Sequence, residues 1–100
     1  MRRAARADEN QPAIVEGLRK LGAAVQPLHT VGMGCPDLLV GYGHVNYLIE
    51  IKNPDKPKAG QQLTGDQVIW HANWQGQVGV ARTLSDAITI IQEGQRGSKL

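Results

Sequence analysis

Two apolar runs with a short turn between them occupy the centre of the sequence. The stretch DLLV, residues 37–40, is followed by GYGH and then by VNYLIEIK, residues 45–52. Apolar runs of this length predict β-strands, and the paired glycines between them predict the turn of an antiparallel hairpin. The hairpin limits the fold to one that is built on a β-sheet.

The segments on either side of the hairpin complete a small α/β domain. Helical spacing of apolar residues, capping residues and glycine or proline breaks define the other elements. The predicted elements are a helix at 10–21, strands at 23–30, 37–40, 45–52 and 78–82, a helix from Thr64 to about 73–75, and a last helix capped by Ser85.

A helix between the third and fourth strands is a crossover that lets the fourth strand run parallel to its neighbour. We therefore expect a small mixed sheet flanked by helices, in the order α-β-β-β-α-β-α. A chain of 100 residues has room for one domain, with a flexible basic segment at about 1–8 and a frayed tail at about 95–100.

Composition narrows the classes of protein that remain. Cys35 is the only cysteine, so one chain can form neither an internal disulfide nor a cysteine-based zinc site. No apolar run approaches the roughly 20 residues of a membrane span, and no signal-peptide pattern follows Met1. We expect an intracellular protein, in the cytoplasm of a bacterial or phage-infected cell. The net charge of +2 is too small to identify a polyanionic partner.

Three charged residues meet at the open end of the predicted hairpin. Side-chain alternation places Glu50 and Lys52 on one face of the third strand, about 7 Å apart along it. Antiparallel pairing brings Asp37, at the start of the preceding strand, beside them. Two close carboxylates repel each other unless a positive charge separates them. The pattern therefore predicts a site for a hard divalent cation such as Mg²⁺.

The chemistry that such a site supports is phosphodiester hydrolysis. Mg²⁺ commonly uses one or two carboxylates and completes its shell with water and substrate phosphate. An ammonium group such as that of Lys52 can orient or deprotonate the attacking water and balance charge on phosphorus. The competing interpretation is a salt-bridge cluster with no chemistry, and for an isolated carboxylate-lysine pair that interpretation is the better one.

The wider sequence resembles a known family. Pro36-Asp37, the two apolar strands and the Glu50-Ile51-Lys52 ending resemble the PD-(D/E)XK nuclease superfamily. Across roughly residues 10–90, the chain is similar to the small stand-alone VRR-NUC nucleases of phages and bacteria. The resemblance is carried, in order, by NQPAIVEGLRKLGA, HTVGMGCPDLLVG, NYLIEIKNP and LTGDQVIWHANWQGQVGV.

The resemblance implies roles for particular residues. Asp37 and Glu50 would bind the metal together with the backbone carbonyl of Ile51, and Lys52 would be the catalytic lysine. Gln67 matches a glutamine near the metal site, where the positive end of a helix dipole also favours a phosphate. The alternative for Gln67 is an exposed helical glutamine.

The first helix departs from the family pattern. An acidic residue is expected after the Asn10-Gln11 pair, but Pro12 and Ala13 follow it. Glu9 and Glu16 are candidates to replace that carboxylate, and Glu16 is kept as a candidate metal ligand. The number of metal ions stays open.

The resemblance also implies an activity and a partner. It implies an Mg²⁺- or Mn²⁺-dependent DNA endonuclease that leaves 5′-phosphate and 3′-hydroxyl ends and acts as a homodimer on branched DNA such as four-way junctions. Cleavage of flaps or ends is an alternative, and so is a non-catalytic DNA-binding or assembly protein that keeps the fold. A sequence-specific restriction enzyme is disfavoured because the chain has little room for a base-reading element.

The remaining aromatic and histidine residues favour structural roles. His29, His44 and His71 have no metal-site spacing, which favours structural or surface positions. Trp70 and Trp74 lie four residues apart on the second helix. Core or dimer packing is favoured over base stacking there, because stacking on DNA needs exposed rings beside a basic groove.

Overall fold

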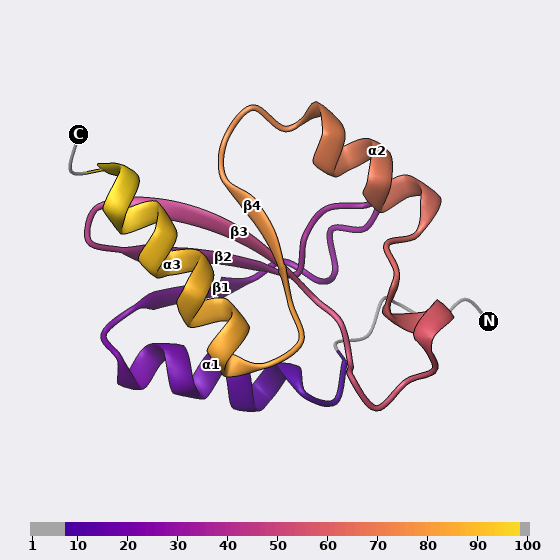
Figure 1. The fold of residues 1–100 in the computed structure, drawn as a ribbon, viewed down its shortest axis with the longest axis horizontal. Coiled ribbons are helices and arrows are strands. Elements are labelled where there is room, and N and C mark those ends of the chain that lie inside the picture. The colour runs from indigo at the N-terminus through magenta and orange to yellow at the C-terminus, as the bar shows by residue number, and fades with distance from the viewer. Residues whose placement is uncertain (1–7, 99–100) are drawn as a thin grey trace.

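The computed structural model describes residues 8–98, and the predicted basic N-terminal segment lies outside this range except for Asp8. Figure 1 shows the elements in chain order. They are α1 (Gln11–Lys20), β1 (Ala24–Pro27), β2 (Leu38–Tyr42), β3 (Val45–Ile51), the 3₁₀ turn η1 (Lys58–Gln61), α2 (Gly65–Asn73), β4 (Val78–Ala81) and α3 (Leu84–Ser98). The predicted order of helices and strands is confirmed.

The four strands form one mixed sheet in the order β1-β2-β3-β4. β1 and β2 pair antiparallel, as do β2 and β3, whereas β4 runs parallel to β3. The hairpin turn is tighter than predicted, because Tyr42 already pairs with Val45. Gly43 and His44 make the turn with φ values of 57° and 66°, the positive φ that two-residue hairpin loops require. The predicted mixed α/β architecture is therefore confirmed.

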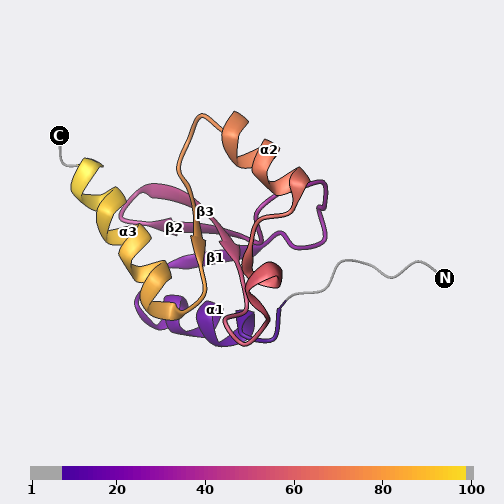
Figure 2. The ribbon, with the colours of Figure 1, turned by 45° about the vertical axis from the view of Figure 1, so that its right-hand side comes forward.

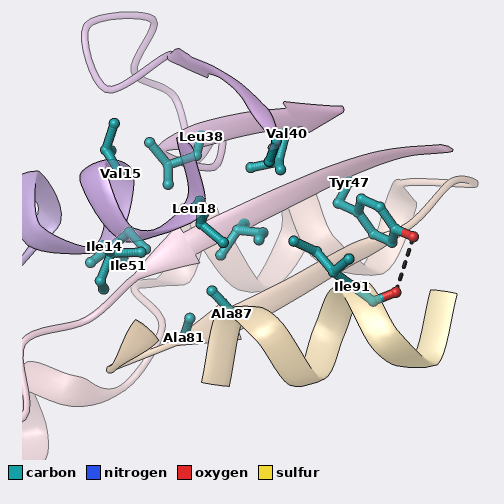
Figure 3. Packing of buried hydrophobic residues seen from close by; sticks show 12 residues of the cluster. Ile14, Val15, Leu18, Leu38, Val40, Tyr47, Ile51, Ala81, Ala87 and Ile91 are labelled. Atoms are coloured by element: carbon teal, nitrogen blue, oxygen red, sulfur yellow. Dashed lines mark hydrogen bonds between the residues drawn. The ribbon is translucent and has the colours of Figure 1, made fainter. Parts of the chain in front are cut away.

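Helices α1 and α3 cover one face of the sheet. In both views they lie together, and α2 stands apart from them (Figure 1, Figure 2). Alternate side chains of β2 and β3 point into the layer between sheet and helices, which is the core of the domain (Figure 3). The core consists of Ile14, Val15, Leu18, Ala23, Leu38, Val40, Tyr47, Ile49, Ile51, Ala81, Ala87 and Ile91.

Tyr47 anchors α3 on the sheet. Its hydroxyl donates to the carbonyl of Ile91 at 3.1 Å, the contact drawn in Figure 3, and accepts from Nε2 of Gln95 at 2.9 Å. The same Gln95 amide donates to the carbonyl of Tyr42 at 2.7 Å. These bonds hold the last turns of α3 against the hairpin, so the predicted fraying from residue 95 is wrong within the described range, where the helix continues to Ser98.

The start of α3 also differs from the prediction. The helix begins at Leu84, and the backbone N–H of Asp86 donates to Oγ1 of Thr83 at 3.1 Å. Thr83, rather than Ser85, is therefore the capping residue. A hydroxyl two residues earlier satisfies the first turn equally well, which the sequence alone does not distinguish.

Helix α2 buries none of its side chains. Val68 is 52% exposed, Ile69 61% and Trp74 44%, so core packing of the tryptophans is not observed for Trp74. The helix is held at its N-terminus, where Thr64 and Gln67 form a reciprocal capping box. No helix within residues 8–98 has the length and apolar character to cross a membrane.

Candidate metal and catalytic centre

The hairpin register brings Asp37 opposite Glu50. Leu38 pairs with Ile49 in the antiparallel register. Asp37, one residue before Leu38, therefore lies across from Glu50, one residue after Ile49. The backbone N–H of Ile51 donates to Oδ2 of Asp37 at 2.8 Å, which holds the Asp37 carboxylate against the end of β3. Strand pairing therefore produces the contact that the sequence predicted.

Lys52 completes this group from the next position on β3. Its ammonium lies 3.7 Å from Oε2 of Glu50 and donates to Oε1 of Gln67 at 2.8 Å. Both side chains are enclosed, with 9% of Lys52 and 4% of Glu50 exposed. Such an enclosed ion pair loses most of its hydration, and further hydrogen bonds are needed to compensate.

Gln67 supplies those hydrogen bonds. Its Nε2 donates to Oε2 of Glu50 at 2.9 Å, while its Oε1 accepts from Lys52 and from the backbone N–H of Thr64 at 2.9 Å. The backbone N–H of Gln67 in turn donates to Oγ1 of Thr64 at 3.3 Å. One residue thus belongs to the cap of α2 and to the charged centre. Gln67 is not the free surface glutamine of the alternative interpretation.

The two carboxyl groups strongly affect each other. Burial and, after it, the charge of Asp37 raise the pKa of Glu50 to about 8 against the opposing effect of Lys52. Burial also raises the pKa of Asp37, although the N–H of Ile51 partly opposes this. In the absence of a cation, the pair therefore favours retaining a proton at neutral pH.

The donor atoms present suit a hard divalent cation. Oε1 of Glu50 is buried and has no hydrogen-bond partner among the described residues. A second carboxylate lies beside it, and the pair gains a partner of opposite charge if a cation sits between them. No group of three or more histidine, cysteine, aspartate or glutamate side chains is arranged for a metal within residues 8–98. Two carboxylates, with water and phosphate completing the shell, fit the coordination habit of Mg²⁺.

Glu16 is not brought to this centre. Its side chain is 72% exposed and pairs with Lys20 at 3.9 Å, one turn further along α1. Glu9 is exposed as well. Neither of the first-helix acids considered from the sequence therefore joins the two carboxylates.

Asp8, which precedes α1, is a further acidic residue near the two carboxylates. Its charge raises the pKa of both Asp37 and Glu50, which places it within electrostatic reach of the pair. It is also held by Lys56, whose Nζ lies 3.2 Å from Oδ1 of Asp8. Asp8 was not among the candidates Glu9 and Glu16, because its nearness to the two carboxylates depends on how the start of α1 is held against the sheet.

The side chain of Asn10 holds the residues before α1 close to the charged centre. Its Nδ2 donates to the carbonyl of Lys52 at 3.0 Å and to the carbonyl of Arg82 at 2.9 Å. The side chain therefore joins the ends of β3 and β4 and does not cap its own helix. The start of α1 is fastened at the edge of the charged centre.

One of the three histidines also lies near the centre. His71 follows Gln67 by one helical turn, and burial and the charge of Lys52 together lower its pKa. Its Nε2 is buried without a hydrogen-bond partner among the described residues. The structural role expected of His71 from the sequence stays a prediction.

The mixed sheet presents two carboxylates and a lysine at the end of its central hairpin. Among solved structures, the chain is similar to one described as a VRR_NUC domain, with a TM-score of 0.61 and 24% sequence identity over 82% of this chain and 89% of that chain. The chain therefore has the fold of a VRR-NUC domain, in agreement with the family that its sequence resembles. No protein-family model matches the chain, and no curated protein matches it.

Proposed function

We propose that the chain is a metal-dependent nuclease that hydrolyses phosphodiester bonds in DNA. The observation that carries the proposal is the enclosed group of Asp37, Glu50 and Lys52, joined by Gln67 at the end of the hairpin. Keeping two carboxylates enclosed together in this way opposes folding, because burial disfavours the ionised form of both and the charge of Asp37 further disfavours ionisation of Glu50. A cation-binding role gives this arrangement a function that a structural salt bridge does not.

Each residue has a distinct part in the proposed reaction. Asp37 and Glu50, with the carbonyl of Ile51, would hold Mg²⁺ or Mn²⁺, which supplies charge neutralisation for the phosphate and a lower pKa for the attacking water. Lys52 balances the charge that develops on phosphorus and orients the water. Gln67 keeps the ammonium and the Glu50 carboxylate in place through its two amide atoms.

The finer part of the proposal concerns the substrate. We propose a homodimer that cuts branched DNA such as four-way junctions, leaving 5′-phosphate and 3′-hydroxyl ends. A two-fold dimer suits a two-fold substrate, and a chain of this size gains buried surface by pairing.

The chemistry is tested with Lys52→Ala and Asp37→Asn proteins. We expect each to lose cleavage by at least about a hundredfold, because each removes a group that acts on the transition state. Lys58→Ala is the matched control, since Lys58 is an exposed lysine of the neighbouring turn η1. Undiminished cleavage by both folded variants would sink the assignment.

The substrate is tested by comparing linear, nicked, flapped and four-way DNA with Mg²⁺, Mn²⁺ or EDTA. We expect cleavage with either metal, none with EDTA, and the highest rate on the four-way DNA. Sedimentation should show a dimer at micromolar concentration. A monomer would count against junction cleavage while leaving the nuclease chemistry in place.

A further inference from the structure

A hollow of about 350 Å³ lies between α2 and the loop that leads to Asp37. The loop contributes Met33, and the helix contributes the other lining residues. These are Asp66, Ile69, Trp70, Asn73 and Trp74. Three of the apolar side chains remain open to solvent, with Met33 88% exposed, Ile69 61% and Trp74 44%. Large apolar side chains gathered around an open hollow mark a binding site more often than an ordinary surface.

Two of the residues that line the hollow, Trp70 and Trp74, stack on each other. Their ring centroids lie 4.7 Å apart with an interplanar angle of 18°, which is a stacked pair. The backbone at Gly76 lies against the ring of Trp74, because a Cβ atom at Gly76 would fall 2.8 Å from Nε1 of Trp74. The indole of Trp74 is therefore positioned in advance, and a planar ligand that stacks on it loses little ring freedom on binding.

The charges around the hollow favour a neutral ligand. Its lining contains no lysine or arginine, and its one charged side chain is the carboxylate of Asp66. The hollow therefore suits a single uncharged ring and not the sugar-phosphate backbone, and it differs from the basic groove that stacking along a continuous single strand requires. Asn73 and Asp66 also line the hollow and carry an amide and a carboxylate, the groups that hydrogen-bond to the edges of nucleobases.

The hollow is attached directly to the charged centre. At Gly34, φ is 86° and a Cβ atom would fall 2.5 Å from the carbonyl oxygen of Asp66, so the loop packs tightly against the first turn of α2. Gln67, the next residue of that turn, donates to Glu50. The first turn of α2 therefore connects the hollow to the charged centre, where the proposed function places cleavage.

We propose that the hollow binds one unpaired nucleobase of a DNA substrate, stacked on Trp74 and covered by Met33, next to the scissile bond. The inference rests on the nuclease function proposed above and adds a preference for DNA with an unstacked base. Branch points and bulges supply such bases, whereas a continuous duplex keeps them stacked and enclosed.

The test measures binding in EDTA, so that no cleavage occurs, to a paired duplex and to the same duplex with one bulged 2-aminopurine. We expect tighter binding of the bulged duplex and a fall in 2-aminopurine emission as the base stacks on the indole. Trp74→Ala and Met33→Asn should weaken binding of the bulged duplex by about tenfold, within the range for one stacked base, and leave the paired duplex unchanged.

Two variants control for misfolding and for a general effect of removing an exposed apolar side chain. Met33→Asn should fold normally, because Met33 is exposed at a φ of 57°, a conformation that asparagine tolerates. Val68→Gln is the matched control, because Val68 is an exposed apolar residue of the same helix that does not line the hollow. Its binding to both duplexes should equal that of the wild type.

Three outcomes would overturn the inference. They are equal binding of the two duplexes by the wild type, an equal loss in Val68→Gln, and a loss in Trp74→Ala that is accompanied by dissociation of an oligomer in sedimentation. Cleavage with Mg²⁺ but without any preference for the bulge removes the inference and leaves the nuclease. A bulge preference without cleavage supports the base site and removes the nuclease.

Discussion

Glu50 shows how a single buried side chain combines a structural cost with a chemical use. Only 4% of the side chain is exposed, and its Oε1 accepts no hydrogen bond from the described residues. Burial and the neighbouring Asp37 raise its pKa to about 8, so at neutral pH the ionised form is disfavoured. A carboxylate in this condition gains more from a cation than one that is already hydrated or paired.

This condition predicts an unusual pH dependence for the metal-free protein. Between its ordinary value of 4.5 and about 8, Glu50 holds a proton in the folded chain but not in the unfolded chain. Unfolding then releases a proton, so the free energy of unfolding falls as the pH rises through that window. Denaturant unfolding in EDTA should show lower stability at pH 8 than at pH 7.

Glu50→Gln is the control for the pH prediction. It keeps the size of the side chain and removes the titrating group, so most of the difference between pH 7 and pH 8 should disappear. The comparison stays above pH 7 because the lowered pKa of His71 has the opposite effect on stability at lower pH. Equal slopes in the two proteins would contradict the prediction.

Among the elements, α2 depends on its first turn for its attachment. None of its side chains is buried, and within residues 8–98 the hydrogen bonds that tie it to the end of β3 run through Gln67 to Glu50 and Lys52. The reciprocal cap between Thr64 and Gln67 sets the geometry of that turn. Stability of the helix and geometry of the charged centre are therefore linked through one residue.

Two substitutions in this turn should distinguish the contribution of the helix cap from that of the hydrogen bonds to the charged centre. Thr64→Ala removes the hydroxyl that accepts from the Gln67 backbone and should cost about 1 kcal/mol while leaving the Gln67 side-chain bonds. Gln67→Leu also removes the bonds to Glu50 and Lys52, so we expect a much larger loss of cleavage. Thermal unfolding and cleavage rates measured on both proteins test this. Equal loss of cleavage in the two would contradict it.

Two glycines of α3 provide a second matched pair. A Cβ atom at Gly94 would collide with the ring of Tyr47, whereas one at Gly97 meets nothing within 4 Å. Gly94→Ala should therefore destabilise the protein by about 1–3 kcal/mol despite the higher helix propensity of alanine. Gly97→Ala should be neutral or stabilising by up to about 1 kcal/mol. Chemical denaturation of both variants is the measurement.

For the molecule as a whole, a cation at the centre should stabilise the fold. A ligand that binds only the folded chain contributes about 2.7 kcal/mol at a concentration one hundred times its Kd. Saturating Mg²⁺ or Mn²⁺ should therefore raise the Tm of the wild type. The Tm of Glu50→Gln should not respond, because one of the two carboxylates is gone. Equal shifts in both proteins would place the binding elsewhere.

The sequence was sufficient for those parts of the molecule that depend on neighbours along the chain. Strand alternation and hairpin register predicted that Asp37, Glu50 and Lys52 meet, because a two-residue period and a tight turn leave one arrangement. The nearness of Asp8 to the two carboxylates was not predicted, because it depends on where the Asn10 side chain holds the start of α1. The exposed ring of Trp74 was missed because periodicity indicates a face of a helix and not whether anything covers it.

Asn10 has a consequence for the order in which the molecule becomes functional. Its amide joins the carbonyls of Lys52 and Arg82, so the setting of the charged centre includes the strand that is made after α2. On the ribosome, a nascent chain holds Asp37, Glu50, Lys52 and Gln67 before it holds β4. The proposed activity should therefore arise only after residues up to Arg82 have left the exit tunnel, which delays the proposed cutting of nucleic acid until β4 can pair with β3.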